Sequence, residues 1–148
     1  MGSRPMENNL AGSRILIVED ESPLRLLLTE FLSDEGFSIT EAESGDQAIV
    51  LLDGCETYDL VFTDISLPGR ADGNAVGDKA KQRCHDLPVL YASACKESLK
   101  NQIGPSDAFL DKPCKLHDII TVVQRLLSLA GARRLSASLP LSAHLVAE

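Results

Sequence analysis

The sequence predicts an α/β protein with one doubly wound, five-stranded parallel sheet and helices on both faces. Two patterns point to this fold. Short apolar runs without polar alternation, typical of strands covered on both faces, recur along the chain. Longer segments with the apolar spacing of helices separate these runs. Strands that alternate with helices usually pair in parallel through right-handed crossovers, so these patterns favour a single parallel sheet.

Length and composition agree with one globular domain. The chain has 148 residues, of which 44% are hydrophobic and 24% charged, so it can bury a core. Its net charge of −8 repels nucleic-acid phosphates and anionic membranes. We therefore expect neither nucleic acid nor a membrane as a partner. The apolar runs are too short to span a bilayer and no secretory signal opens the chain, which favours a cytoplasmic protein.

Five strands and five helices are expected in alternation, after an unpatterned polar segment over residues 1–13. That segment is interpreted as a flexible arm or a remnant of cloning. The expected strands are residues 15–18, 37–42, 58–64, 87–93 and 108–112. The expected helices are residues 23–36, 44–54, 74–84, 96–103 and 117–130. Residues 131–148 are expected to form a C-terminal tail, because they are too few for a second domain.

The first two helices carry clear end signals. Ser22 offers an N-cap with Pro23 at the first helical position, and Gly36 suits the helix end. Ser44 and Gln47 have the spacing of a capping box. These signals place both helices between apolar runs, as the alternating pattern requires.

The second half of the chain is less regular. A loop rich in proline and glycine, "ISLPGRADG", follows the third strand. The helix over residues 74–84 is only weakly indicated, because it contains Gly77 and few apolar positions. The last helix has a wide apolar stripe, which we expect to pack on the sheet.

Polar residues end four of the five strands. Glu19 and Asp20 follow the first strand, and Asp64, Ser93 and Lys112 end the third, fourth and fifth. Parallel strands bring these ends to one sheet edge, where α/β proteins bind ligands. Close carboxylates repel one another unless a cation neutralises them, and oxygen-only ligands suit Mg²⁺. The sequence therefore predicts a Mg²⁺ site beside a lysine and a hydroxyl, complementary to a phosphoryl group.

Four motifs in this order carry a family resemblance. They are "ILIVEDE", "DLVFTDISLPGRADG", "PVLYASA" and "AFLDKP". With them, residues 14–130 resemble the receiver domains of two-component response regulators. The resemblance implies a flavodoxin-like sheet of strand order 2-1-3-4-5. It also implies a phosphorelay function without ordinary enzymatic turnover, beyond slow self-catalysed phosphorylation and dephosphorylation.

The resemblance also assigns roles to the residues of the acidic edge. Asp64 matches the phosphoacceptor, which takes its group from a phosphohistidine on a histidine kinase or histidine phosphotransfer protein. Asp20 is implied to bind Mg²⁺ directly, and Glu19 to bind it directly or through water. The backbone carbonyl of Ser66 is implied to complete the protein ligands together with Asp64.

Three further residues are implied to act on the phosphoryl group and to transmit its effect. Lys112 pairs with the acceptor and then with a phosphoryl oxygen, while Ser93 binds another oxygen and draws its loop inward. Phe109 matches the switch position and is implied to turn inward. The implied output surface for a downstream protein comprises residues 96–103, 108–112 and 117–130. A plain core role for Phe109 stays open as an alternative.

The sequence departs from the usual family pattern at several points. The first acid is Glu19 where aspartate is common, Ser93 replaces threonine, and Phe109 lacks the hydroxyl of tyrosine. The loop after Asp64 is one residue longer than the common version, and the two helices that follow it are short. These differences bear on the metal loop and on the output face.

Several alternatives remain open at this point. A phosphorylation-independent docking module is the main one, motivated by the short segment over residues 96–103. A flavodoxin-like enzyme is less favoured, because no glycine-rich nucleotide motif follows the first strand. The chain is either a stand-alone receiver or part of a hybrid kinase or longer regulator, and pairing into a homodimer is a further alternative. The four cysteines are expected to be free and mostly buried.

Overall fold

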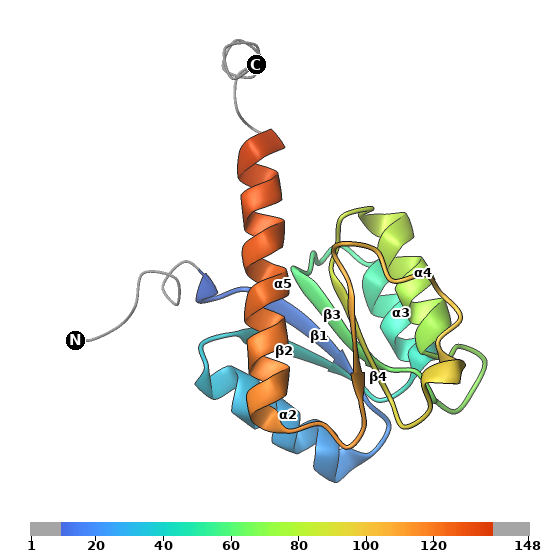
Figure 1. Cartoon of the computed structure of the whole chain (residues 1–148). Helices are drawn as coiled ribbons and strands as arrows, with labels where there is room; N and C mark the ends of the chain where they lie inside the picture. The colour runs from blue at the N-terminus through green and yellow to red at the C-terminus, as the bar shows by residue number, and fades with distance from the viewer. Residues whose placement is uncertain (1–9, 138–148) are drawn as a thin grey trace.

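Five parallel strands form one sheet in the order β2-β1-β3-β4-β5 (Figure 1). The structure is a computed structural model, and it describes residues 10–137. The strands are β1 (Arg14–Val18), β2 (Ser38–Ala42), β3 (Leu60–Asp64), β4 (Val89–Ser93) and β5 (Ala108–Asp111). All four strand pairings are parallel, so every carboxyl end lies at one edge of the sheet. The predicted fold class is confirmed.

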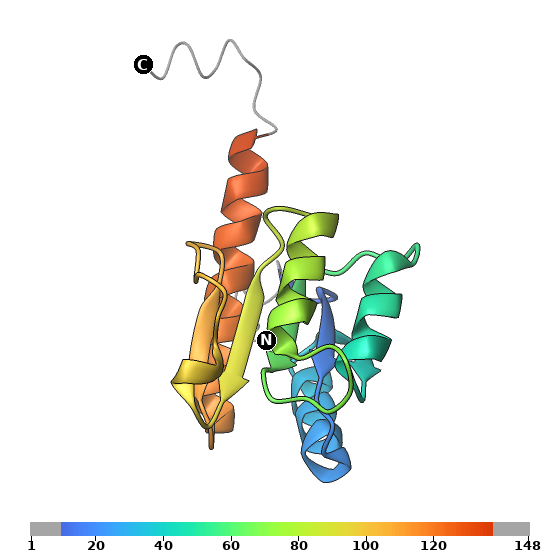
Figure 2. The ribbon, with the colours of Figure 1, turned by 90° about the vertical axis from the view of Figure 1, so that its right-hand side faces the viewer.

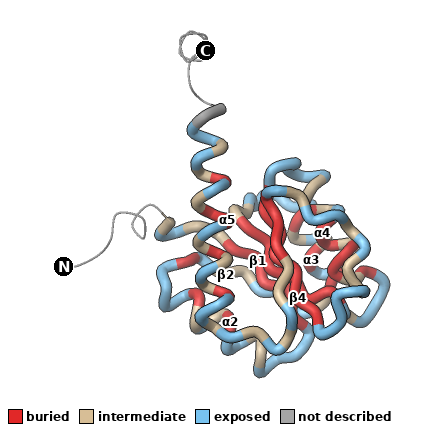
Figure 3. Tube along the Cα trace, viewed as in Figure 1, coloured by how far each residue is buried: buried red, intermediate tan, exposed pale blue. Residues whose placement is uncertain are grey.

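Helices cover both faces of the sheet, as Figures 1 and 2 show. They are α2 (Ser22–Asp34), α3 (Gly45–Asp53), α4 (Gly73–Arg83) and α5 (Leu116–Ala137). Successive strand residues point to opposite faces. Ile15 and Ile17 therefore pack with α2 and α5, while Leu16 and Val18 pack with α3 and α4. Figure 3 shows the buried strands between these two layers.

The end signals of the first two helices are largely confirmed. Ser44 caps α3, since its Oγ accepts a hydrogen bond from the amide of Gln47 at 3.0 Å. Gly36 follows α2 with a φ of +102°, a left-handed conformation that glycine adopts without steric cost. The expected N-cap role of Ser22 is wrong: Ser22 is the first residue of α2, and Glu21 takes the cap position without a side-chain cap.

The expected helix over residues 96–103 is also wrong. Only a single 3₁₀ turn, η1 (Lys96–Ser98), follows β4. The side chain of Asn74 binds the next residues instead, because its Oδ1 accepts from the amides of Lys100 at 2.8 Å and Asn101 at 3.2 Å. Those amides therefore bond a distant side chain rather than carbonyls of their own segment, and no helical turn continues past Ser98.

The last helix is longer than expected. We expected it to end at Ala130, but α5 continues to Ala137 and extends beyond the sheet (Figure 1). Arg133 ties this extension to the segment before β5, because its Nη1 donates to Ser106 Oγ at 2.7 Å. Within residues 10–137, none of the helices combines the length and the apolar character that a membrane span needs.

All four cysteines are free thiols, as expected, but their expected burial is wrong. Cys55, Cys84 and Cys95 are exposed, and Cys114 is half-buried. They occupy helix ends and loops rather than strand interiors, which explains their exposure.

Candidate functional site

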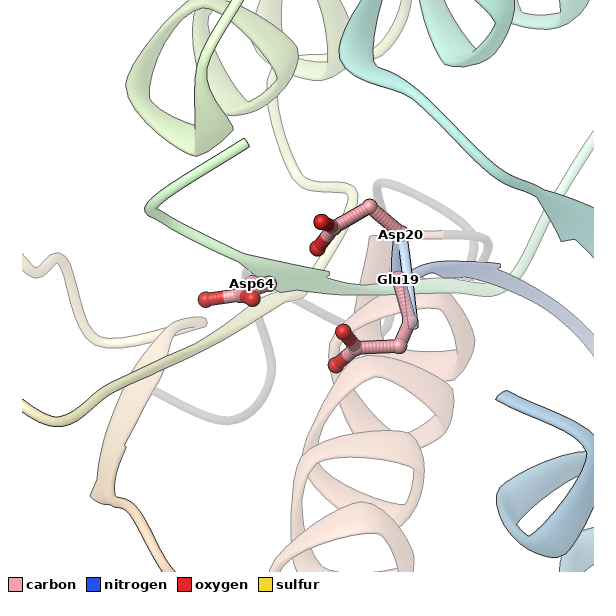
Figure 4. A group of neighbouring side chains, drawn as sticks. All are labelled: Glu19, Asp20 and Asp64. Carbon is pink, nitrogen blue, oxygen red and sulfur yellow. The ribbon is translucent and has the colours of Figure 1, made fainter. Parts of the chain in front are cut away.

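Three carboxylates meet at the carboxyl edge of the sheet. Glu19 and Asp20 follow β1, and Asp64 is the last residue of β3. One carboxylate oxygen from each lies within 4.8 Å of the others, and Figure 4 shows the three side chains pointing to the same side. Glu19 is only 3% exposed and Asp64 only 7%, whereas Asp20 faces solvent. The sheet therefore brings together the three acids that the sequence predicted.

Lys112 joins the acids from the end of β5. Its Nζ donates to Glu19 Oε1 at 3.0 Å and to Asp64 Oδ2 at 3.1 Å. The backbone amide of Lys112 donates to the carbonyl of Ser93, and this hydrogen bond fixes the backbone position from which the Lys112 side chain extends. One cation thus faces two buried carboxylates. The cluster of Glu19, Asp20, Asp64 and Lys112 carries three acids against one base and so keeps a net negative charge.

Burial and pairing act against each other in this cluster. Burial raises the pKa of Glu19, although its hydrogen bonds from Lys112 and from the amide of Glu21 oppose the change. Burial alone would lower the pKa of Lys112, but its hydrogen bonds to Glu19 and Asp64 outweigh burial and the pKa is raised. The cluster therefore favours a charged lysine and stands to gain from a further cation.

The remaining predicted residues lie around this cluster. Ser93 is buried, and its Oγ donates to the carbonyl of Cys95 at 3.0 Å and accepts from the Cys95 amide at 3.1 Å. Ser66 is exposed, and its amide donates to Asp64 Oδ1 at 3.3 Å. Phe109 is half-buried against the core on the α3 and α4 side. The Ser93 hydroxyl thus bonds its own loop rather than Asp64 in this conformation.

The loop between Asp64 and α4 is tightly held. A Cβ at Gly73 would lie 2.3 Å from the carbonyl oxygen of Asp64, and the Gly73 amide donates to Ile65 at 2.8 Å. Asp46, in the first turn of α3, accepts from the amide of Arg70 at 3.3 Å. These contacts fix the chain on both sides of Ser66, so the loop that was expected to complete a metal site has a defined backbone.

Two residues near the site carried no signal in the sequence. Arg25 donates to the backbone carbonyl of Glu19, and Asn74 holds the segment that follows η1. Both act on groups that are brought near by folding. A single arginine or asparagine at a helix start is common on protein surfaces, and nothing in its local pattern distinguishes these two.

The donor set fits a hard divalent cation. Every side-chain ligand candidate is a carboxylate, and two of the three acids come from adjacent positions, so their oxygens are fixed by one short stretch of backbone. Such oxygen donors suit Mg²⁺ with part of its water shell retained. Lys112 supplies only one positive charge against three acids, so the cluster can accept a further cation without becoming strongly positive.

An apolar cavity of about 390 Å³ lies beside the acids. Glu19, Asp64 and Lys112 line it. Residues of β1, β3 and β4 form its floor, and residues of α2, the β5–α5 connection and α5 form most of its remaining wall. The cavity lies between α2 and the start of α5. A side chain from another molecule could therefore approach the acids along an apolar wall.

Comparison with known proteins gives a consistent result. Residues 15–124 match the family described as Response regulator receiver domain. The transcriptional regulatory protein CpxR of Escherichia coli (strain K12) is 30% identical over 118 residues, which are 78% of this chain and 49% of CpxR. ResD of Bacillus subtilis (strain 168) is 33% identical over 123 residues, 80% of this chain and 50% of ResD. The chain thus spans about half the length of these relatives.

Solved structures agree with the sequence matches. A response regulator receiver protein from Sinorhizobium medicae WSM419 has a TM-score of 0.76 at 30% identity, covering 82% of this chain and 98% of the other. The receiver domain of the hybrid histidine kinase CckA has a TM-score of 0.66 at 28% identity, covering 78% of this chain and 99% of that domain. The family match over residues 15–124 includes Glu19, Asp20, Asp64, Ser93 and Lys112.

Proposed function

The chain belongs to the response regulator receiver domain family of two-component systems, and from that membership we propose that Asp64 accepts a phosphoryl group from a phosphohistidine. The strongest support is the number of polar groups that surround the Asp64 carboxylate. Lys112 binds one of its oxygens at 3.1 Å, the Ser66 amide lies 3.3 Å from the other, and two further acids lie beside it. Asp64 ends β3, which is the central strand of the sheet.

The transfer exchanges one bond for another. A carboxylate oxygen of Asp64 forms a bond to phosphorus and the phosphorus–nitrogen bond to histidine breaks. The histidine ring takes one proton from solvent as it leaves, so that neutral imidazole is released. Lys112 steers the carboxylate and then pairs with a phosphoryl oxygen. The Ser93 hydroxyl leaves the backbone of Cys95 to bind another phosphoryl oxygen. Positioning and charge therefore contribute most of the rate.

In this proposal Glu19, Asp20, Asp64 and the Ser66 carbonyl would hold Mg²⁺. When bound, Mg²⁺ supplies positive charge that offsets the carboxylates and the incoming phosphoryl group. Glu19 and Asp64 are buried, so their mutual repulsion is poorly screened without that charge. The three acids and the Ser66 carbonyl would thus hold the ion, and Lys112 would exchange its bond to Asp64 for a bond to a phosphoryl oxygen.

Two surfaces are proposed for protein partners. A histidine kinase or histidine phosphotransfer protein docks over the cavity of about 390 Å³ beside Asp64, where the apolar wall of the cavity adjoins the acceptor.

The downstream protein binds the face formed by η1, β5 and α5, and Phe109 turns inward as the Ser93 loop moves. Ile103 and Leu129 are exposed near this face, at 42% and 43%. The acidic chain makes a protein partner more suitable than nucleic acid for this segment.

A phosphorylation assay tests the acceptor. Acetyl phosphate with Mg²⁺ should add one phosphoryl group to the chain, detected by intact mass, and chelation of the metal should abolish the addition. Asp64→Asn keeps the shape of the side chain and should remain unmodified. Asp78→Asn is the matched control, since it neutralises an exposed aspartate of α4, and it should react like the wild type. An equal addition to the Asp64→Asn variant would refute the assignment.

A docking module that works without phosphorylation is the second candidate. The observation that favours it is the replacement of the expected helix over residues 96–103 by the single turn η1. Beryllofluoride, which mimics the phosphoryl group, separates the two. Large amide shifts around Ser93 and Phe109 support the phosphorylated switch, whereas shifts confined to the acids support constitutive docking.

A further inference from the structure

Arg25 occupies an electrostatically unfavourable position for an arginine. It lies near the beginning of α2, where the helix dipole is positive and a cation is destabilising. Its side chain is nevertheless only 15% exposed and folds back toward the acidic edge. A cation held against the dipole needs compensating contacts, and those contacts show what it does.

The guanidinium of Arg25 joins three elements. Its Nη1 donates to the backbone carbonyl of Glu19 at 2.8 Å, and its Nε donates to Glu41 Oε1 on β2 at 3.1 Å. Its Nη2 lies 3.4 Å from Ser22 Oγ in the same helix turn. The planar guanidinium can serve these partners at once, which a lysine ammonium on a flexible stem cannot do with the same geometry.

The carbonyl that Arg25 binds belongs to the peptide unit between Glu19 and Asp20. A peptide unit is planar, so fixing its oxygen also fixes the amide of Asp20. The preceding peptide is fixed as well, because the Glu19 amide donates to the carbonyl of Ala42 at 3.1 Å. Asp20 is exposed, and the direction of its carboxylate therefore depends on the orientation of this backbone.

We propose that Arg25, held by Glu41, is a positioning residue of the metal site: it fixes the Glu19–Asp20 peptide so that both carboxylates face Asp64. This inference rests on the proposed Mg²⁺ site. The hydrogen bonds that Arg25 donates go to the Glu19 carbonyl, Glu41 and Ser22 and not to the carboxylates of Glu19, Asp20 or Asp64, so Arg25 acts on the site through the backbone. Its positive charge opposes the binding of a cation, so its benefit comes from geometry.

Because the charge of Arg25 opposes cation binding, the direction in which Mg²⁺ affinity changes on its removal tests the proposal. Arg25→Met keeps the length of the stem and removes the guanidinium. If Arg25 mattered only through its charge, its loss would strengthen Mg²⁺ binding, because a nearby repulsive charge disappears. Positioning predicts the reverse: a dissociation constant about tenfold higher, the lower range for residues that orient metal ligands. Calorimetric titration with Mg²⁺ alone measures this without any phosphodonor.

Two further variants complete the experiment. Arg25→Lys keeps the charge with a less suitable geometry and should fall between the wild type and Arg25→Met. Glu41→Gln should weaken binding less than Arg25→Met does. Combined with Arg25→Met, it should add only the small weakening expected from the loss of one negative charge, because Glu41 otherwise acts through Arg25. Lys79→Ala is the matched control: it removes a cation that pairs with Asp53 at the surface, and should not weaken binding.

A readout without metal follows the backbone itself. In the metal-free protein, Arg25→Met should shift and broaden the amide resonance of Asp20, while Lys79→Ala leaves it unchanged. Equal or tighter Mg²⁺ binding by a folded Arg25→Met variant would overturn the positioning role. Failure of the wild type to bind Mg²⁺ would instead refute the metal site of the proposed function, so the two failures are distinguishable.

Discussion

Gly77 in α4 shows how a single position can be decided by a neighbouring element. A Cβ on Gly77 would lie 2.0 Å from the hydroxyl oxygen of Tyr91, which is 2% exposed on β4. The Tyr91 hydroxyl accepts from Asn101 Nδ2 at 3.1 Å, and burial raises the pKa of the tyrosine. The glycine that made this helix a weak prediction is thus the residue that lets a tyrosine pack beneath it.

Gly77→Ala should destabilise the domain even though alanine favours helices. The helix propensity of alanine contributes about 1 kcal/mol, but the clash with the Tyr91 ring forces a shift that costs about 1–3 kcal/mol. Gly131→Ala is the control, because it adds the same methyl group in α5 with no atom within 4 Å. Urea unfolding should show a loss for Gly77→Ala and a small gain for Gly131→Ala. A gain at both positions would contradict the packing argument.

The segment between β4 and β5 depends on a buried asparagine rather than on a helix. Asn74 is 8% exposed, and its Nδ2 donates to the carbonyl of Ser98 at 2.9 Å. Its backbone carbonyl accepts from Asn101 Nδ2 at 2.9 Å. The Asn74 side chain thus binds backbone carbonyl and amide groups of the irregular segment, because its Oδ1 also accepts from the amides of Lys100 and Asn101. The start of α4 and the loop beyond Ser93 are therefore joined as one unit.

Asn74→Ala should loosen this segment before it affects the rest of the domain. The amides of Lys100 and Asn101 lose their common acceptor in a partly buried position, which costs about 0.5–1.5 kcal/mol for each hydrogen bond. Hydrogen exchange at these two amides should accelerate more than exchange in β1 or β3. Gln102→Ala, in the same segment but exposed, should leave both rates unchanged. Unaltered exchange in Asn74→Ala would show that the segment is held by other contacts.

The whole domain concentrates negative charge at one edge of a stable sheet. Two apolar layers hold β1 and β3 side by side, with Val18 opposite Thr63 in register. Glu19 and Asp20, which follow β1, and Asp64, which ends β3, are therefore held close despite their mutual repulsion. A folded scaffold that maintains like charges together gains stability when a cation binds, because the unfolded chain has no such site.

Mg²⁺ should accordingly raise the free energy of unfolding, by about 2.7 kcal/mol at a concentration one hundred times its dissociation constant. Asp20→Asn should remove most of this gain. Because Asp20 is exposed, the substitution should leave the metal-free protein as stable as the wild type or slightly more so. Asp34→Asn, an exposed acid at the far end of α2, should keep the full gain. Thermal unfolding with and without Mg²⁺ measures all three, and an undiminished gain in Asp20→Asn would contradict the expected ligand role.

Much of the candidate site could be predicted because its residues sit at the ends of strands. Apolar runs located β1, β3 and β5, and parallel pairing places the ends of such strands at one edge. Glu19, Asp64 and Lys112 could thus be grouped without coordinates. Their proposed chemical roles remain predictions, since proximity alone does not establish phosphoryl transfer.

The sequence by itself determined the sheet, most of the helix ends and the acidic edge, because each follows from local periodicity, end signals and parallel pairing. The tertiary structure alone decided that residues 96–103 contain only the turn η1 and no longer helix, that Gly77 accommodates Tyr91, and that Arg25 binds the Glu19 carbonyl. The physical reason is the same in each case. These features depend on contacts whose partners folding brings together, and neighbouring letters in the sequence carry no record of such contacts.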